Sequence, residues 1–130
     1  MGIKLLEQCG IPTAIITGRN SKMVLARCEE LGIKHVHMGV ENKAIALAQV
    51  IKSLGLSLSD CAVMGDDWPD LQMMKNAGFR VCPAQAHEAV KESAHFVTHC
   101  SGGNSAVREV CDLILKAQNR YEELLNKARN

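Results

Sequence analysis

The feature that most constrains the fold is a regular alternation of helical segments with short apolar runs, with Gly or Pro at most boundaries. The runs within residues 13–16 and 61–64 read as strands buried on both faces. The segments between them carry apolar side chains at mostly helical spacing. This alternation predicts a three-layer α/β fold, in which a doubly wound parallel sheet lies between two layers of helices.

The predicted elements fill one domain, residues 1–130. We expect helices at residues 3–8, 21–31, 41–54, 67–77, 86–93 and 104–128, and strands at residues 13–16, 35–38, 61–64, 79–82 and 95–98. The last helix would be roughly 36 Å long, which is longer than a small domain needs. We therefore expect the segment 104–130 to reach a subunit interface. The alternative is a frayed amphipathic terminus.

Composition excludes several classes of function. The formal net charge is +1, which gives no reason to expect a nucleic acid or a membrane as partner. No apolar run approaches the roughly 18–20 residues of a membrane span, and no signal peptide is visible. The six cysteines form no C-x-x-C pair and lie in apolar runs, so we expect them reduced and buried in a cytoplasmic protein.

In a parallel sheet of this kind the ligand site lies beyond the carboxyl ends of the strands. Thr17, Gly18 and Arg19 follow the first predicted strand and precede a helix. A hydroxyl, a close backbone approach and a guanidinium at a helix start can together bind an oxyanion. These three residues therefore predict a phosphate cradle. The alternative is a turn with a helix cap and a surface arginine.

Two further strand ends carry charged residues. Lys43 lies in the first turn of a helix, where its charge opposes the helix dipole unless an anion is near; the alternative is a solvated lysine. Asp66, Asp67 and Asp70 follow the strand at 61–64. An N-cap explains one aspartate, but adjacent carboxylates repel each other unless a cation such as Mg²⁺ relieves them. Together the Thr, the Lys and the Asp pair are typical of phosphoryl transfer.

These motifs resemble those of the haloacid dehalogenase superfamily. Residues 15–19 resemble its second motif, Lys43 its third, and residues 65–67 with Asp70 its fourth. The likeness is greatest to the 3-deoxy-D-manno-octulosonate 8-phosphate phosphatases and covers essentially the whole chain. It is carried also by Ser21, Val24, Arg27, residues 31–33, 84–87 and 97–98, Gly102, Gly103 and residues 106–113.

The resemblance implies a fold, an activity and roles for residues. The fold is the superfamily's Rossmann-like domain without a large cap domain. The activity is Mg²⁺-dependent hydrolysis of the sugar-acid phosphate to the free sugar acid for lipopolysaccharide synthesis, in a homotetramer whose tails reach neighbouring active sites. The implied catalytic residues are Thr17 and Lys43, the metal ligand is Asp66, and the implied substrate-binding residues are Lys4, Gly18, Arg19, Arg27, Lys43 and Asp67.

One departure from the family bears on chemistry. The superfamily begins with a strand that ends in Asp-x-Asp-Gly, which supplies the nucleophile and the general acid/base. No aspartate precedes Asp60 here. We therefore expect a central strand, which the family places between residues 12–16 and 61–64, to be missing, either because translation starts upstream of Met1, which we favour, or because the protein is a short form. We also expect the 130 residues alone to be inactive, weak in metal binding and marginally folded.

Other functions remain open from the sequence. A non-catalytic, phosphatase-like assembly module would also lack a nucleophile, although intact Thr17, Lys43, Asp66 and Asp67 oppose it. A phosphatase for a related nine-carbon sugar-acid phosphate fits the same residues. A receiver or flavodoxin-like domain is the weakest alternative, because its acidic cluster would follow the first strand instead of the third.

Overall fold

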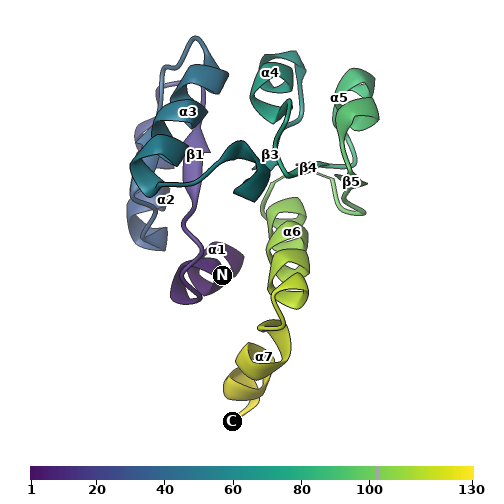
Figure 1. Ribbon diagram of the computed structural model, residues 1–130. Coiled ribbons are helices and arrows are strands. Elements are labelled where there is room, and N and C mark those ends of the chain that lie inside the picture. The colour runs from purple at the N-terminus through teal and green to yellow at the C-terminus, as the bar shows by residue number, and fades with distance from the viewer. Residues whose placement is uncertain (102) are drawn as a thin grey trace.

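The computed structural model describes residues 1–101 and 103–130, so Gly102 of the family-like stretch lies outside the described residues. The described elements follow the predicted alternation of helices and strands (Figure 1). In chain order they are α1 (Gly2–Gln8), β1 (Ala14–Ile16), α2 (Lys22–Leu31), β2 (His35–His37), α3 (Lys43–Leu54), the 3₁₀ turn η1 (Leu58–Asp60), β3 (Ala62–Met64), the 3₁₀ turn η2 (Trp68–Asp70), α4 (Leu71–Met74), β4 (Phe79–Cys82), α5 (Glu88–Ser93), β5 (Phe96–Val97), α6 (Asn104–Ala117) and α7 (Tyr121–Arg129).

All the described strands pair in parallel, which confirms the predicted α/β class. They form two sheets, one of β1 and β2 and one in the order β3-β4-β5. Figure 1 shows α4 and α5 on one side of the strands β3–β5 and α6 on the other. Within the described residues β1 does not pair with β3. The helix α3 joins the two sheets by packing against both β1 and α4.

Two apolar clusters hold the layers together. One lies between the three-stranded sheet and α3–α5, and its fully buried members include Met74, Cys82 and Val90. The other lies among helices, where Leu6 of α1 packs with Cys111 and Leu115 of α6. Aliphatic and sulfur-containing side chains fill both clusters, as expected for a chain in which aromatic residues are only 3%.

The C-terminal helix is not continuous, so the prediction of one helix at 104–128 is wrong. The chain leaves α6 after Ala117 and turns at Asn119, whose φ of 59° is left-handed, before α7 begins at Tyr121. Asn tolerates this conformation better than most residues. Tyr121 and Leu124 then pack on the cluster formed by α1 and α6. This part of α7 therefore contacts its own chain.

The prediction for residues 67–77 is wrong in its extent. The segment is a 3₁₀ turn followed by the one-turn helix α4, which ends at Met74 because Lys75 is extended and Asn76 has a φ of 68°. The prediction that the cysteines are buried holds for Cys28, Cys82 and Cys111. It is wrong for Cys100, which is exposed. Among the described residues no helix has the length and apolar character needed to span a bilayer.

Candidate functional site

The loops after β1 and β2 are joined by backbone hydrogen bonds. Thr17 N–H donates to the carbonyl of His37 (2.9 Å), and Val40 N–H donates to the carbonyl of Thr17 (3.0 Å). Gly39 N–H donates to the carbonyl of Arg19 (3.1 Å). Gly39 has a φ of +64°, and a Cβ there would lie 2.9 Å from the Asn20 amide nitrogen. Glycine therefore allows the two loops to lie against each other.

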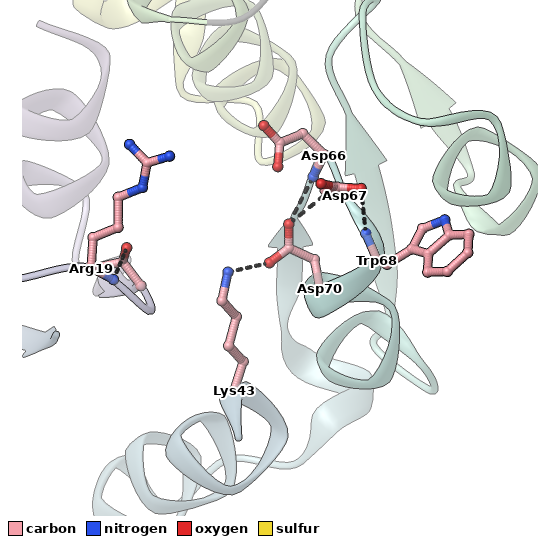
Figure 2. A network of polar contacts seen from close by, with 7 residues as sticks. Arg19, Lys43, Asp66, Asp67, Trp68 and Asp70 are labelled. Atoms are coloured by element: carbon pink, nitrogen blue, oxygen red, sulfur yellow. Dashed lines mark hydrogen bonds and ion pairs between the residues drawn. The ribbon is translucent and has the colours of Figure 1, made fainter. Parts of the chain in front are cut away.

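The predicted phosphate cradle lies in the first of these loops. The Thr17 hydroxyl oxygen accepts a hydrogen bond from Arg19 N–H (3.2 Å), which leaves its hydrogen available to donate to another group. Ser21 caps α2 by accepting from Val24 N–H (3.2 Å), so the helix begins directly after the cradle. The Arg19 side chain makes no ion pair with another described residue, and in Figure 2 its guanidinium projects away from its loop. The loop thus presents a hydroxyl and a cation.

Lys43 is the first residue of α3 and is directed into the molecule. Asn42 caps the helix by accepting from Ile45 N–H (3.1 Å). The Lys43 ammonium lies 2.6 Å from Asp70 Oδ1, and the two side chains are only 17% and 8% exposed (Figure 2). The anion that the sequence required near this lysine is therefore Asp70, and the alternative of a solvated lysine is wrong.

Asp70 is the centre of the loop after β3, which we call the aspartate loop (residues 65–70). Its Oδ2 accepts from Asp66 N–H (2.9 Å) and Asp67 N–H (3.3 Å) while its Oδ1 binds Lys43. Asp67 Oδ1 accepts from Trp68 N–H (2.8 Å). A Cβ at Gly65 would lie 2.5 Å from Asp70 Cβ, so glycine allows the buried carboxylate to approach. One carboxylate thus connects the aspartate loop to α3.

Asp70 belongs to the predicted acidic motif, but the sequence pattern assigns it no role in the site. A signal for it is present in the sequence, because Asp70 stands three residues after Asp67, as in a capping box, and Pro69 between them favours a helical first turn. Three neighbouring aspartates do not by themselves reveal which one turns inward. That choice depends on Lys43, which lies 27 residues earlier in the chain.

The carboxylates of Asp66 and Asp70 differ in their ionisation. Burial raises the pKa of Asp66, and the hydrogen bond with Asp70 and the charges of Asp70 and Asp67 raise it further, against the opposing charge of Lys43. Burial also tends to raise the pKa of Asp70, but the hydrogen bonds from Lys43 and from the Asp66 and Asp67 amides outweigh it, so the pKa is lowered. An ionised Asp66 is therefore under electrostatic stress that a cation would relieve.

The chemistry of Asp66 fits a hard divalent cation, which prefers carboxylate oxygens. Within residues 1–101 and 103–130, however, His, Cys, Asp and Glu side chains form no group of three or more in an arrangement able to hold a metal ion. The described side chains therefore supply part of a metal shell, with Asp66 as its best ligand.

Lys4 and Arg27, which the resemblance assigns to the substrate, lie apart from this network. Arg27 pairs with Glu30 on the same helix (3.1 Å) and lines a cavity of about 450 Å³ with residues of α1 and α6, including Arg108. Lys4 is exposed on α1. Neither side chain makes a hydrogen bond or ion pair to Lys43 or Asp70 among the described residues. The structure thus brings Lys43 together with Asp66 and Asp67, but not with Lys4 or Arg27.

Comparison with known proteins identifies the family. The model of the haloacid dehalogenase-like hydrolases matches residues 39–110. The chain is 43% identical over 122 residues to a 3-deoxy-D-manno-octulosonate 8-phosphate phosphatase of Salmonella typhi, covering 94% of this chain and 65% of that protein. The chain therefore spans about 65% of the length of the curated relatives that it matches.

Solved structures agree with this assignment. The phosphatase from Moraxella catarrhalis, in complex with a magnesium ion, a phosphate ion and a KDO molecule, is 46% identical, with a TM-score of 0.94 over 97% of this chain and 72% of that one. The cobalt-bound phosphatase from Haemophilus influenzae is 34% identical, with a TM-score of 0.89 over 92% of this chain and 70% of that one. The chain belongs to the haloacid dehalogenase-like hydrolases and is homologous to the 3-deoxy-D-manno-octulosonate 8-phosphate phosphatases.

Proposed function

We propose that this chain carries the phosphate- and cation-binding part of a Mg²⁺-dependent phosphomonoesterase that acts on 3-deoxy-D-manno-octulosonate 8-phosphate. The observation that carries the proposal is the Lys43–Asp70 pair, which sets a cation beside Asp66 at the carboxyl ends of parallel strands. The homology to phosphatases of that sugar-acid phosphate supports the choice of substrate.

In this proposal each group has a separate task. The Thr17 hydroxyl donates a hydrogen bond to the transferring phosphoryl group, and Gly18 lets the backbone approach it. Lys43 offsets the negative charge that develops there, which is the main way proteins assist phosphoryl transfer. Asp66 would hold Mg²⁺, which when bound neutralises phosphate charge. Asp67 supports the loop by capping Trp68 N–H.

Arg19, Arg27 and Lys4 would bind the sugar-acid part of the substrate. Arg19 is the best supported of the three, because it shares a loop with Thr17 and makes no ion pair with another described residue. Arg27 and Lys4 rest on the family resemblance alone. We further propose a cytoplasmic homotetramer. The free cysteines are compatible with a reducing compartment, and the segment 104–130 would form the subunit interface, since α7 at its end has no buried residue within its own chain.

We also propose that the 130 residues by themselves do not turn over substrate. The superfamily's nucleophile stands in an Asp-x-Asp-Gly motif, and no aspartate precedes Asp60. Lys43 and Thr17 can orient a phosphate but cannot form a covalent phosphoaspartate. The described β1 and β3 do not pair with each other, which is compatible with a further strand between them in a longer protein.

The test is phosphate release from 3-deoxy-D-manno-octulosonate 8-phosphate with Mg²⁺. The 130-residue chain is compared with the same chain preceded by an Asp-x-Asp-Gly strand from a full-length relative. We expect release only from the extended protein, and a loss of roughly 100-fold when it carries Lys43→Met. Equal turnover by the short chain would refute its inactivity.

Two further outcomes separate the alternatives. No release from a folded, extended protein would refute the phosphatase function and favour the non-catalytic assembly module. Faster release from a nine-carbon sugar-acid phosphate than from the eight-carbon compound would retain the reaction and correct the substrate. Light scattering of the same preparations tests the homotetramer, which a monomeric mass would refute.

A further inference from the structure

Trp68 is the single tryptophan of the chain and follows Asp67 directly, yet its side chain is among the most exposed apolar groups, at 64%. In Figure 2 its indole points away from Lys43 and Arg19. The large apolar ring therefore contributes little to the core. What it does contact is His87, across 19 residues of sequence.

The contact between the two rings is specific. The Trp68 ring nitrogen lies 3.1 Å from His87 Nδ1 and 3.2 Å from His87 Nε2, and the rings meet edge to face with centroids 5.3 Å apart. The indole nitrogen can only donate, so a neutral imidazole nitrogen accepts. Such a contact between aromatic rings favours one orientation of the indole.

His87 is itself attached to the aspartate loop by a second bond. Its backbone N–H donates to the carbonyl of Asp66 (2.9 Å). Its Nδ1 also accepts from Ala89 N–H (3.0 Å), which caps α5. Because a neutral imidazole has one acceptor nitrogen, Nδ1 is shared between Ala89 N–H and the indole N–H, and this fixes the orientation of the imidazole. The loop after β4 is thus joined to the loop after β3 by one backbone bond and one side-chain bond.

Asp66 is consequently held from two directions. Its N–H donates to Asp70 on the side of α3, and its carbonyl accepts from His87 on the side of α5. The Asp70 contact depends on Lys43, whereas the His87 contact is reinforced by Trp68. Because the three carboxylates of the loop repel one another, the loop needs such restraints to keep Asp66 in one position.

We propose that Trp68 and His87 are positioning residues, forming a latch that holds the aspartate loop and keeps Asp66 in place for a divalent cation. This inference rests on the proposed function, because that function assigns the cation to Asp66. It adds two residues that act on the loop from outside the phosphate cradle.

The test uses three variants. Trp68→Phe keeps an aromatic ring but removes the N–H, and His87→Ala removes the imidazole. His87→Asn keeps a side-chain oxygen that can still cap α5 and accept a hydrogen bond from the indole. Met23→Ala on α2 is the control for loss of an exposed apolar side chain far from the loop in sequence. Amide hydrogen exchange at Asp66 and His87, and line broadening by Mn²⁺ at the aspartate loop, are measured by NMR on the chain extended by the Asp-x-Asp-Gly strand.

We expect Trp68→Phe and His87→Ala to speed exchange of the Asp66 amide and to weaken Mn²⁺ binding about fivefold, as for loss of one hydrogen bond. His87→Asn should keep both the exchange rate of the Asp66 amide and the Mn²⁺ affinity close to the wild-type values. Met23→Ala should change neither of these two quantities. Unchanged exchange and Mn²⁺ affinity in Trp68→Phe and His87→Ala would overturn the latch. Faster exchange with unchanged Mn²⁺ affinity would also overturn it, because the contact would then be merely structural.

Failure of the proposed function has a different signature. If the wild-type chain extended by the Asp-x-Asp-Gly strand shows no Mn²⁺ broadening at any concentration, the metal role of Asp66 is refuted. The exchange rate of the Asp66 amide in the same variants still tests whether the latch holds the loop, because that measurement needs no metal. Since Trp68 is the only tryptophan, its fluorescence in wild type and His87→Ala reports the same contact independently.

Discussion

The two sheets of this protein differ in how deeply they are buried. Each residue of β1 and β2 is half-buried, whereas Val63 of β3 and Val81 and Cys82 of β4 are buried. The phosphate cradle stands on the first sheet and the aspartate loop on the second. Between them lie α3 and the Lys43–Asp70 pair. Stability is thus concentrated on the side of the aspartates, and the cradle depends on loop-to-loop bonds and on α3.

The largest expected effect tests this difference in burial. Met74→Ala removes a fully buried side chain beneath the second sheet and should destabilise the protein by about 2–5 kcal/mol. Ile15→Ala in half-buried β1 should cost about half as much, because less surface returns to water. Urea unfolding of both variants measures the difference. Equal losses would show that the two sheets are equally well packed.

The second prediction concerns the connection between the two regions. Lys43→Met leaves the buried Asp70 carboxylate without its cation and should cost about 3 kcal/mol in the free energy of unfolding. Lys43→Met combined with Asp70→Asn should recover part of that loss, because no unpaired charge remains. A double-mutant cycle measures the coupling. Additive effects of the two substitutions would mean that the pair does not join the regions.

The third prediction tests how the cradle is held. Gly39→Ala places a methyl group against Asn20 at a left-handed φ and should cost about 2 kcal/mol. Gly32→Ala is the matched control, since its φ is also positive but no atom lies within 4 Å of the added Cβ. The control should cost about 1 kcal/mol. When Gly39→Ala is combined with Asn20→Ala, the loss in stability caused by Gly39→Ala should fall to that of the Gly32→Ala control, as measured by thermal unfolding.

The fourth prediction concerns pH and the loop after β5, next to the second sheet. Glu109 accepts from His99 N–H (3.0 Å) and Cys100 N–H (3.1 Å), and these bonds lower its pKa to about 2. The folded state therefore gains stability from Glu109 above its ordinary pKa of 4.5 and loses it as pH falls toward about 2.

Glu109→Gln should flatten the pH dependence of stability in this range, while Glu122→Gln on α7 serves as control. Acid titrations followed by circular dichroism measure both. The same slope in Glu109→Gln and wild type would show that the carboxylate does not hold this loop.

The smallest effect is expected at Arg27. Its pair with Glu30 is exposed and spans one helical turn, so Arg27→Gln should change the free energy of unfolding by no more than about 0.5 kcal/mol. In the extended protein the same variant should raise KM more than it lowers kcat if Arg27 binds the sugar acid. A loss of more than 1 kcal/mol in stability would instead give Arg27 a structural role.

Much of the fold follows from local sequence. The observed strand β4 matches its predicted span, and α2 and α3 begin at Ser21 and Asn42 caps and end at glycines with left-handed φ. The boundaries were wrong where tertiary packing decides. The α4 helix stops at Met74, and the C-terminal helix breaks at Asn119, because neither place carries a Gly or Pro that marks the end in advance.

Sequence alone determined the class of fold, the family resemblance and the strand ends where chemistry would lie, because periodicity, caps and short motifs are local properties. Only the tertiary structure decided which aspartate pairs with Lys43, that Arg27 lies apart from that pair, and that Trp68 meets His87. These contacts join residues far apart in the chain, and burial and distance exist only once the loops have been brought together.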